Sequence, residues 1–271
     1  MAIVDSVDEI RHELVREAMR MAGVDRGVEI AIMADIPSEG CGLGSSSSLT
    51  VGLLNAFYSY RGIQVPAEQL AREACEIEID ICGKPIGKQD QYIAAYGGLR
   101  YFGFNPDESV EVGDLAVHNG SRGVGDVLLL FYTNLTRSAD VILEEQKANT
   151  VSRGAYLQRI RALADRARDE VKAGRYHGLG DVLRENWEAK KELASTITNP
   201  EIDAMVDRCL DSGASGCKVC GAGGGGFLLV ACPGDKVSRV REGMCAYREM
   251  PFFFERCGSK VIFNVESYEW K

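Results

Sequence analysis

The chain of 271 residues is 45% hydrophobic and 26% charged, which is the composition of a folded globular protein and not of a disordered one. Its 31 basic and 40 acidic side chains give a formal net charge of −9, and this argues against nucleic acid as a partner, because such a surface needs clustered lysine and arginine. No apolar run approaches the ~20 residues that span a bilayer, and residues 1–21 lack the core of a signal peptide. We therefore expect a cytoplasmic protein without a membrane partner.

The nine cysteines are irregularly spaced and odd in number, which is typical of reduced thiols and agrees with this compartment. Cys217 and Cys220 form a C-x-x-C, but no second pair follows at the spacing of a zinc finger, and the chain has three histidines. A structural zinc site or a redox dithiol is therefore a weaker interpretation than a short strand that leads into a glycine loop.

The first part of the chain alternates helices and strands. Residues 7–22 repeat apolar positions at helical spacing and predict a helix that Gly23 ends. Residues 28–37 alternate and are β-branched, which predicts a strand that ends at Pro37. A loop of glycine and serine follows, and further helices are expected over 49–62 and from Pro66 to about Cys82.

The remainder of the chain combines a helical block with strands on both sides. Strands are expected over 98–104, 110–118 and 126–133, and a helical stretch over 138–210 with breaks at 174–180 and 199–200. The last residues predict strands at 217–220 and 227–232, a helix at 234–247, and strands at 250–255 and 259–264. This order predicts an α+β fold with two sheet regions, which we divide into domains 1–120 and 121–271.

The segment PSEGCGLGSSSS, residues 37–48, lies between a predicted strand and a predicted helix. Its glycines let the backbone approach a ligand, and its serines coincide with the unpaired N–H groups of a helix start, so we expect an anion-binding loop. No lysine follows as in a P-loop, residues 83–89 do not fit that motif, and a dinucleotide fingerprint lacks its third glycine and its acidic residue. A serine N-cap accounts for one of the four serines.

Two carboxylates in the next segment stand out. Helical periodicity places Glu78 on a face of small residues, where a carboxylate must be paired, neutralised or bound to a cation. The alternative is an edge residue that reaches water or a lysine. Asp90 is expected in a loop close to Lys88, whose charge would keep the pKa of the carboxyl low and suit it to accept or orient a hydroxyl proton. Ordinary turn chemistry is the alternative for Asp90.

The segment CGAGGGGFLLV, residues 220–230, has five glycines in the six positions 221–226 before a predicted strand. So many glycines lose much conformational entropy on folding. They are therefore expected where the backbone must pass close to a ligand or to a second loop. A plain linker explains them less well.

These three segments, in this order, resemble the GHMP kinase superfamily, which includes galactokinase, homoserine kinase and mevalonate kinase. Within it, PIGKQDQYIAAYGG and LLLFYTNLTRSADVILEEQ are most similar to the sugar-1-kinases that act on D-glycero-D-manno-heptose 7-phosphate. The resemblance begins at about Ile10 and covers nearly all of the chain. It implies a first domain like domain 2 of ribosomal protein S5 and a ferredoxin-like second domain.

The resemblance also implies a role for each motif residue. The family's second motif would hold ATP, and Ser46 with Glu78 would bind Mg²⁺. Asp90 would act as the base toward the sugar hydroxyl, with Lys88 beside it, and Arg137 would bind the sugar's own phosphate. The residues implied in ATP binding are Pro37, Gly40, Gly42, Leu43, Gly44, Ser45, Ser46 and Ser47, and those near substrate are Gly223, Gly224 and Gly225.

The family usually begins with a strand pair that carries an R-x-P-x-R element and a G-G-T-D-like segment, and residues 1–11 contain no counterpart, so we expect a first domain truncated at its start. The expected function is ATP-dependent phosphorylation of a sugar or sugar phosphate at its anomeric hydroxyl; a homodimer is compatible with it. The alternatives are a catalytically weak regulator that binds nucleotide or sugar, and mevalonate-type or homoserine-type substrates. A serine hydrolase is disfavoured, because no G-x-S-x-G motif occurs.

Overall fold

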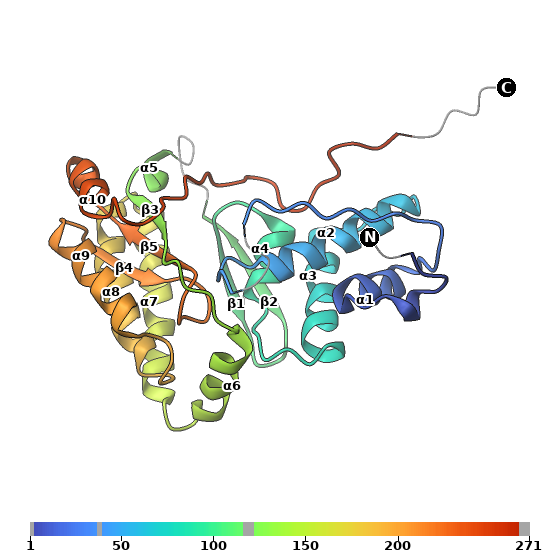
Figure 1. The fold of residues 1–271 in the computed structure, drawn as a ribbon, viewed down its shortest axis with the longest axis horizontal. Coiled ribbons are helices and arrows are strands. Elements are labelled where there is room, and N and C mark those ends of the chain that lie inside the picture. The colour runs from blue at the N-terminus through green and yellow to red at the C-terminus, as the bar shows by residue number, and fades with distance from the viewer. Residues whose placement is uncertain (1–2, 37–39, 116–121, 266–271) are drawn as a thin grey trace. The chain divides into compact units, whose positions relative to one another are not determined.

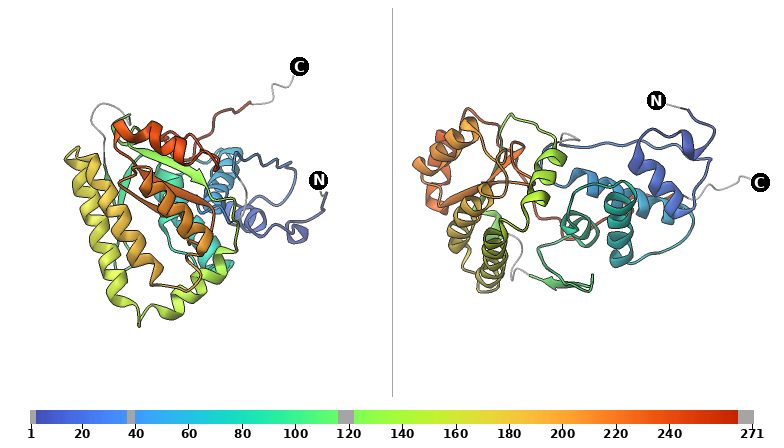
Figure 2. Two further views of the ribbon diagram at one scale, coloured as in Figure 1. Left: turned by 60° about the vertical axis from the view of Figure 1, so that its left-hand side comes forward. Right: turned by 90° about the horizontal axis from the view of Figure 1, so that it is seen from below.

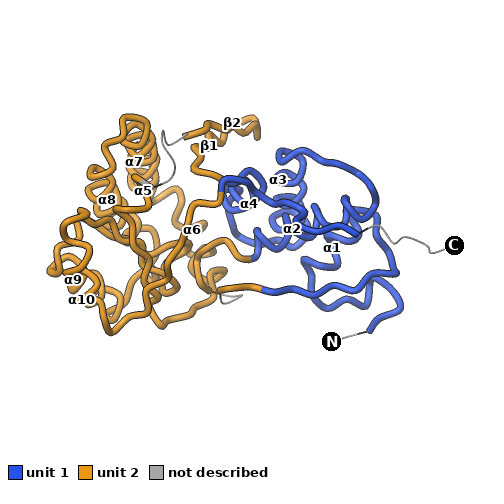
Figure 3. The backbone as a smooth tube through the Cα atoms, turned by 90° about the horizontal axis from the view of Figure 1, so that it is seen from above, with its two compact units in different colours: residues 1–33, 46–97, 256–271 blue, residues 34–45, 98–255 orange. Residues whose placement is uncertain are grey.

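The computed structural model describes residues 3–36, 40–115 and 122–265 (Figure 1). The chain forms two compact units (Figure 3). Unit 1 comprises Met1–Met33, Ser46–Gly97 and Arg256–Lys271, and unit 2 comprises Ala34–Ser45 and Gly98–Glu255. Each unit is therefore assembled from segments that are distant in the sequence. The division at residue 120 stays a prediction, because the units follow contacts and not the order of the chain.

Unit 1 is built from helices in its described residues. Its elements are a 3₁₀ turn (Val7–Glu9), α1 (Glu13–Ala22), α2 (Ser45–Tyr60, whose first residue belongs to unit 2), α3 (Ala67–Cys75) with a π-helical continuation (Glu76–Ile81), and α4 (Gln89–Tyr96). The helices predicted in this part are confirmed, except that the first begins at Glu13 and not at residue 7; Gly23 ends α1 in the left-handed conformation, as expected. Helix α3 packs on α4, and α1 packs on the π-helical segment. Buried apolar side chains such as Ala18, Leu54, Ala74 and Ile77 form the interior.

Unit 2 contains two antiparallel sheets. The first pairs β1 (Arg100–Phe104) with β2 (Val110–Asp114), and the second has the order β3-β5-β4, with β3 (Leu128–Tyr132), β4 (Gly216–Val219) and β5 (Phe227–Ala231). Leu229 of β5 pairs with Leu130 on one side and with Lys218 on the other. These strands lie where the sequence predicts them, and the part of the second expected strand beyond residue 115 falls on residues outside the description.

Several helices of unit 2 pack around its three-stranded sheet. They are α5 (Arg122–Gly125), α6 (Ala139–Asn149), α7 (Gly154–Lys172), a 3₁₀ turn (Tyr176–Gly178), α8 (Leu179–Lys191), α9 (Pro200–Asp211), a second 3₁₀ turn (Gly234–Lys236) and α10 (Val237–Gly243). Helix α8 packs on β4 and β5, α9 packs on β4, and α7 runs alongside α8 (Figure 2). The breaks near 174–180 and 199–200 are confirmed, and Asn199 Oδ1 caps α9 by accepting from Ile202 N at 2.9 Å. The α+β class is confirmed.

Three predicted strands are wrong. Residues 28–36, 251–255 and 259–264 have no regular secondary structure, and Glu249 forms an isolated bridge with Phe131. Alternation supplies an apolar face, but a strand also needs a neighbour for its backbone N–H and C=O groups, and within the described residues these segments have no such ladder. Their apolar side chains are exposed, as Phe253 (95%) and Ile262 (86%) illustrate.

None of the described helices is long and apolar enough to cross a membrane.

Candidate functional site

Glu78 lies at the centre of a buried polar cluster in unit 1. Its Oε2 accepts from Ser47 Oγ at 2.7 Å and from Gln91 Nε2, and its Oε1 accepts from Thr50 Oγ1 at 2.8 Å. The four side chains are each at most 1% exposed. Glu78 is therefore a buried, hydrogen-bonded carboxylate and not an edge residue that reaches water.

The backbone around Glu78 is a π-helical segment, Glu76–Ile81, which continues α3 without a break. Such segments are rare and concentrate at functional sites, because the extra residue in the turn changes the direction of the side chains. Here the segment turns Glu78 toward the first residues of α2 and toward α4.

Ser47 and not Ser46 contacts Glu78. Ser46 is exposed, and its carbonyl oxygen accepts from Thr50 Oγ1 at 3.0 Å, whereas the Ser47 side chain is buried. Ser47, Thr50 and Leu54 are spaced at i, i+3 and i+7, so the helical periodicity of α2 contained a signal that could have found Ser47 and Thr50. The role of Ser46 as a metal ligand stays a prediction.

The donor atoms of the cluster suit a hard cation. Glu78, Ser47 and Thr50 offer oxygen, and Gln91 Oε1 is a buried acceptor that no donor reaches within the described residues. Mg²⁺ is typically held by one or two carboxylates together with phosphate oxygens and water, so one carboxylate fits such a site. No group of three or more histidine, cysteine, aspartate or glutamate side chains able to hold a metal occurs in the described parts of the chain.

Asp90 lies in the first turn of α4 and not in a loop, and Lys88 precedes that helix. Burial raises the pKa of the Asp90 carboxyl above its usual range, so the expectation that Lys88 holds it low is wrong. Residues two apart at a helix start do not face each other. The charge of Lys88 instead acts on the Cys75 thiol, whose pKa burial nevertheless raises to about 12. A carboxylate with a raised pKa is a better proton acceptor near neutral pH.

Two glycine loops meet in unit 2. Gly40, Gly42 and Gly44 have φ between 68° and 70°, and the loop continues into α2 at Ser45. A Cβ atom on Gly42 would lie 2.7 Å from the Cys220 carbonyl oxygen, and one on Gly221 would lie 2.5 Å from the Cα atom of Gly42. The two backbones are thus in contact where only glycine fits, which confirms the expected close approach to a second loop.

The turn 221–226 is also packed tightly against its own unit. Gly224 N donates to Ile197 O at 2.7 Å, and Cβ atoms on Gly223 and Gly225 would lie 2.9 Å from Ile197 O and 2.5 Å from Leu135 O. Packing alone therefore accounts for these glycines. Their contact with substrate stays a prediction.

Arg137 lies against both loops. Its carbonyl oxygen would be 2.7 Å from a Cβ on Gly40, and its Cδ would be 3.4 Å from a Cβ on Gly224. The structure thus brings Arg137 to the place where the two loops meet. Ser45 Oγ lies 3.7 Å from Cys41 Sγ, and Leu43 packs on the cluster of Cys41, Leu130 and Phe227. Pro37 lies outside the described residues.

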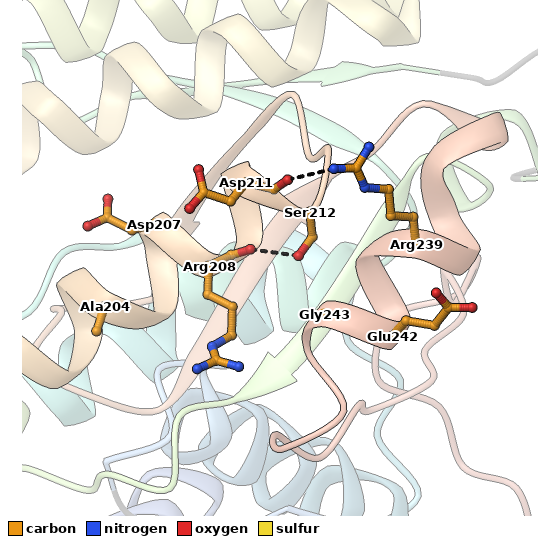
Figure 4. Close-up of a pocket in the computed structure, with 8 residues that line it drawn as sticks. All are labelled: Ala204, Asp207, Arg208, Asp211, Ser212, Arg239, Glu242 and Gly243. Atoms are coloured by element: carbon orange, nitrogen blue, oxygen red, sulfur yellow. Dashed lines mark hydrogen bonds between the residues drawn. The ribbon is translucent and has the colours of Figure 1, made fainter.

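A separate open hollow lies between α9 and α10 (Figure 4). Arg239 Nη2 donates to Asp211 O at 3.2 Å across it, and its other charged side chains are Asp207, Arg208, Asp211 and Glu242. It contains none of the residues that the sequence singled out, so we do not assign the site to it.

The comparisons with known proteins decide the family. The family model "GHMP kinases N terminal domain" matches residues 10–98, and "GHMP kinases C terminal" matches residues 167–249. This chain belongs to the GHMP kinase superfamily. The resemblance that the motifs indicated is thereby confirmed, together with the two-domain fold.

Relatives of this GHMP family member include two kinds of kinase. A D-glycero-alpha-D-manno-heptose 7-phosphate kinase of Campylobacter jejuni is 32% identical over 72% of this chain and 58% of its own length. A mevalonate kinase of Methanothermobacter thermautotrophicus is 28% identical over 76% of this chain and 65% of its own length. The chain thus spans less than two thirds of these relatives. A crystal structure of a D-glycero-D-manno-heptose 1-phosphate kinase from Bacteroides thetaiotaomicron shares the fold with a TM-score of 0.69 at 23% identity, covering 91% of this chain and 73% of that one.

Proposed function

We propose that this chain transfers the γ-phosphoryl group of ATP to the anomeric hydroxyl of a sugar or sugar phosphate, and that its acceptor is D-glycero-D-manno-heptose 7-phosphate, which would become the 1,7-bisphosphate. The observation that carries the proposal is the cluster of Ser47, Thr50, Glu78 and Gln91 at the start of the helix that follows the glycine loop. The heptose-phosphate acceptor is supported by the similarity to the Campylobacter relative.

In this proposal the loop from Gly40 to Gly44 and the first N–H groups of α2 hold the phosphates of ATP, because a helix start offers unpaired donors and the positive end of its dipole. Arg137, beside the same loop, is proposed to bind the phosphate of the sugar. Glu78 would hold Mg²⁺ together with one serine. That serine is either Ser47, which contacts Glu78, or Ser46, which the motif favours. When bound, this ion compensates the charge of the phosphates.

Asp90 is the proposed base. Its carboxylate accepts the proton of the anomeric hydroxyl as the hydroxyl oxygen bonds to the γ-phosphorus, and the bond from that phosphorus to the bridging oxygen breaks to release ADP. The raised pKa of Asp90 suits this step, because the carboxylate is a stronger base than an exposed aspartate. The other groups fix geometry and charge, which supply most of the catalysis of phosphoryl transfer.

The test is Mg²⁺-dependent consumption of ATP by the full chain with D-glycero-D-manno-heptose 7-phosphate, mannose, fucose, galactose or mevalonate as acceptor. Turnover with the heptose phosphate and loss of that turnover in Asp90→Asn support the proposal. Turnover with mevalonate as the only acceptor would show that the acceptor is not a sugar. Binding of nucleotide without turnover of any acceptor would favour a regulator.

A further inference from the structure

Two lysines of unit 2 lie on elements that adjoin the glycine turn, α8 and β4. Lys190, near the end of α8, is 8% exposed and its Nζ donates to the carbonyl oxygen of Gly221. Lys218, in β4, is half-buried and its Nζ donates to Asn186 Oδ1 at 2.8 Å. Helix α8 packs directly on β4, and the two ammonium groups are close enough for the charge of Lys218 to act on Lys190.

Neither lysine has a carboxylate partner among the described residues. Among the ion pairs of the described residues, no aspartate or glutamate oxygen lies within 4.0 Å of Nζ of Lys190 or Lys218. Burial, and then the charge of Lys218, lower the pKa of Lys190 to about 7, and burial also lowers the pKa of Lys218. Buried lysines are normally paired, because removing an ammonium group from water is costly. When the two lysines are protonated, no carboxylate of the described residues therefore compensates their charge.

The position of the pair indicates what would supply that charge. Gly221, which Lys190 binds, touches the first loop at Gly42, and the same turn reaches Arg137 at Gly224. Lys190 and Arg137 thus adjoin the same turn, and Lys218 lies close enough for its charge to act on Lys190 and on Cys220, which precedes the turn. Each lysine uses one donor and retains two, so together they can give four hydrogen bonds to a tetrahedral dianion.

We propose that Lys190 and Lys218 bind a phosphate group carried by the acceptor, so that the substrate class is the sugar phosphates and not the free sugars. This inference rests on the proposed function, since it concerns the acceptor of that reaction. The phosphates of the nucleotide are the other source of the same chemistry. The acceptor is favoured because the N–H groups at the start of α2 already offer donors to the phosphates of the nucleotide.

The test measures binding without turnover. Calorimetric titrations use D-glycero-D-manno-heptose 7-phosphate, mannose 6-phosphate, mannose and the nonhydrolysable nucleotide AMPPNP with Mg²⁺. The variants are Lys190→Met, Lys218→Met and Lys190→Gln, which keeps a donor for Gly221 without the charge. Lys191→Met is the matched control, because Lys191 follows Lys190 in α8 but pairs with Glu188 at 2.9 Å.

We expect the unaltered chain to bind at least one sugar phosphate at least tenfold more tightly than mannose. Lys190→Met, Lys190→Gln and Lys218→Met should each weaken that binding at least tenfold, with the Kd of AMPPNP unchanged within twofold. Binding of neither sugar phosphate, equal loss of AMPPNP and sugar phosphate, or unchanged affinities would each overturn the proposal. Circular dichroism and Tm identify variants that fail to fold. If Lys190→Met fails to fold, Lys218→Met and Lys190→Gln still test the proposal.

The two proposals can fail separately. Lysine-dependent binding of sugar phosphate without any consumption of ATP would support the anion site and contradict the kinase activity. Turnover of unphosphorylated sugars that is unchanged in the Lys190 and Lys218 variants would support the kinase activity and contradict the anion site.

Discussion

Ser47 Oγ donates a hydrogen bond of 2.7 Å to Oε2 of Glu78, and this contact joins the first turn of α2 to the π-helical end of α3. It connects two residues that are 31 positions apart in the sequence. The segment that begins at the glycine loop is thereby fixed to a buried carboxylate.

Ser47→Ala should lower the stability of the protein, because it removes a donor from a buried carboxylate. The expected loss in the free energy of unfolding is about 1–3 kcal/mol. The same variant and Glu78→Gln should weaken binding of Mg-AMPPNP more than that of AMPPNP alone, by calorimetry. Ser46→Ala is the control. Its side chain is exposed, so the stability should change by less than about 0.5 kcal/mol. If Ser46→Ala is the only variant in which AMPPNP binding no longer depends on Mg²⁺, Ser46 and not Ser47 is the metal ligand.

Asp90→Asn should lower kcat by ~10² to 10⁴ if Asp90 is the base. The same variant should raise Tm at neutral pH. The folded-state pKa is raised above the unfolded one, so the stability that the protonated carboxyl contributes is lost as the pH rises through the folded pKa, and asparagine avoids this loss. Activity of the unaltered chain should fall on the acid side at a higher pH than for an ordinary aspartate. A Tm of Asp90→Asn that is lower throughout would contradict the buried environment of this carboxyl.

The sequence predicted elements well where a local pattern is sufficient. Periodicity located α2 and β3, and the glycines predicted the close contact of Gly42 with Gly221. Prediction from the sequence failed where the structure of a segment depends on a partner that is distant in the chain. The alternating residues 28–36 look like a strand, but alternation does not reveal whether a neighbouring strand exists.

The candidate site shows the same limit at the level of single side chains. The face of the helix pointed correctly to Glu78 as a buried acid, but the motif indicated Ser46, whereas Ser47 contacts Glu78. Which serine faces Glu78 depends on where α2 begins. Asp90 looked like a loop residue because Gly87 precedes it, whereas α4 begins at Gln89. Lys190 and Lys218 lie 28 positions apart and carry no signal, since their burial follows from the packing of α8 on β4.

Gly42→Ala should damage the glycine loop. Its φ of 70° costs an alanine roughly 1–2 kcal/mol, and the new Cβ would lie 2.7 Å from the Cys220 carbonyl oxygen, so the backbone must shift. We expect a lower free energy of unfolding in urea and weaker binding of AMPPNP. Gly52→Ala is the opposite case, because Gly52 lies within α2 with no atom within 4 Å of the added Cβ, and it should stabilise by ~0.5–1 kcal/mol. Equal effects of the two variants would contradict the contact between the loops.

Binding of sulfate to the lysine pair should strengthen as the pH falls through about 7, where Lys190 becomes protonated. Sulfate keeps two charges over this range, so the change in affinity reports the protein. Of the neighbouring groups, Lys218 adds positive charge, and the Cys220 thiol stays neutral because burial raises its pKa. The lowered folded-state pKa of Lys190 also means that the stability present above its unfolded pKa is lost as the pH falls through about 7. Lys190→Met should therefore flatten both pH profiles, measured by calorimetry and by Tm between pH 6 and 9. Profiles that keep their slope in this variant would assign the titration to another group.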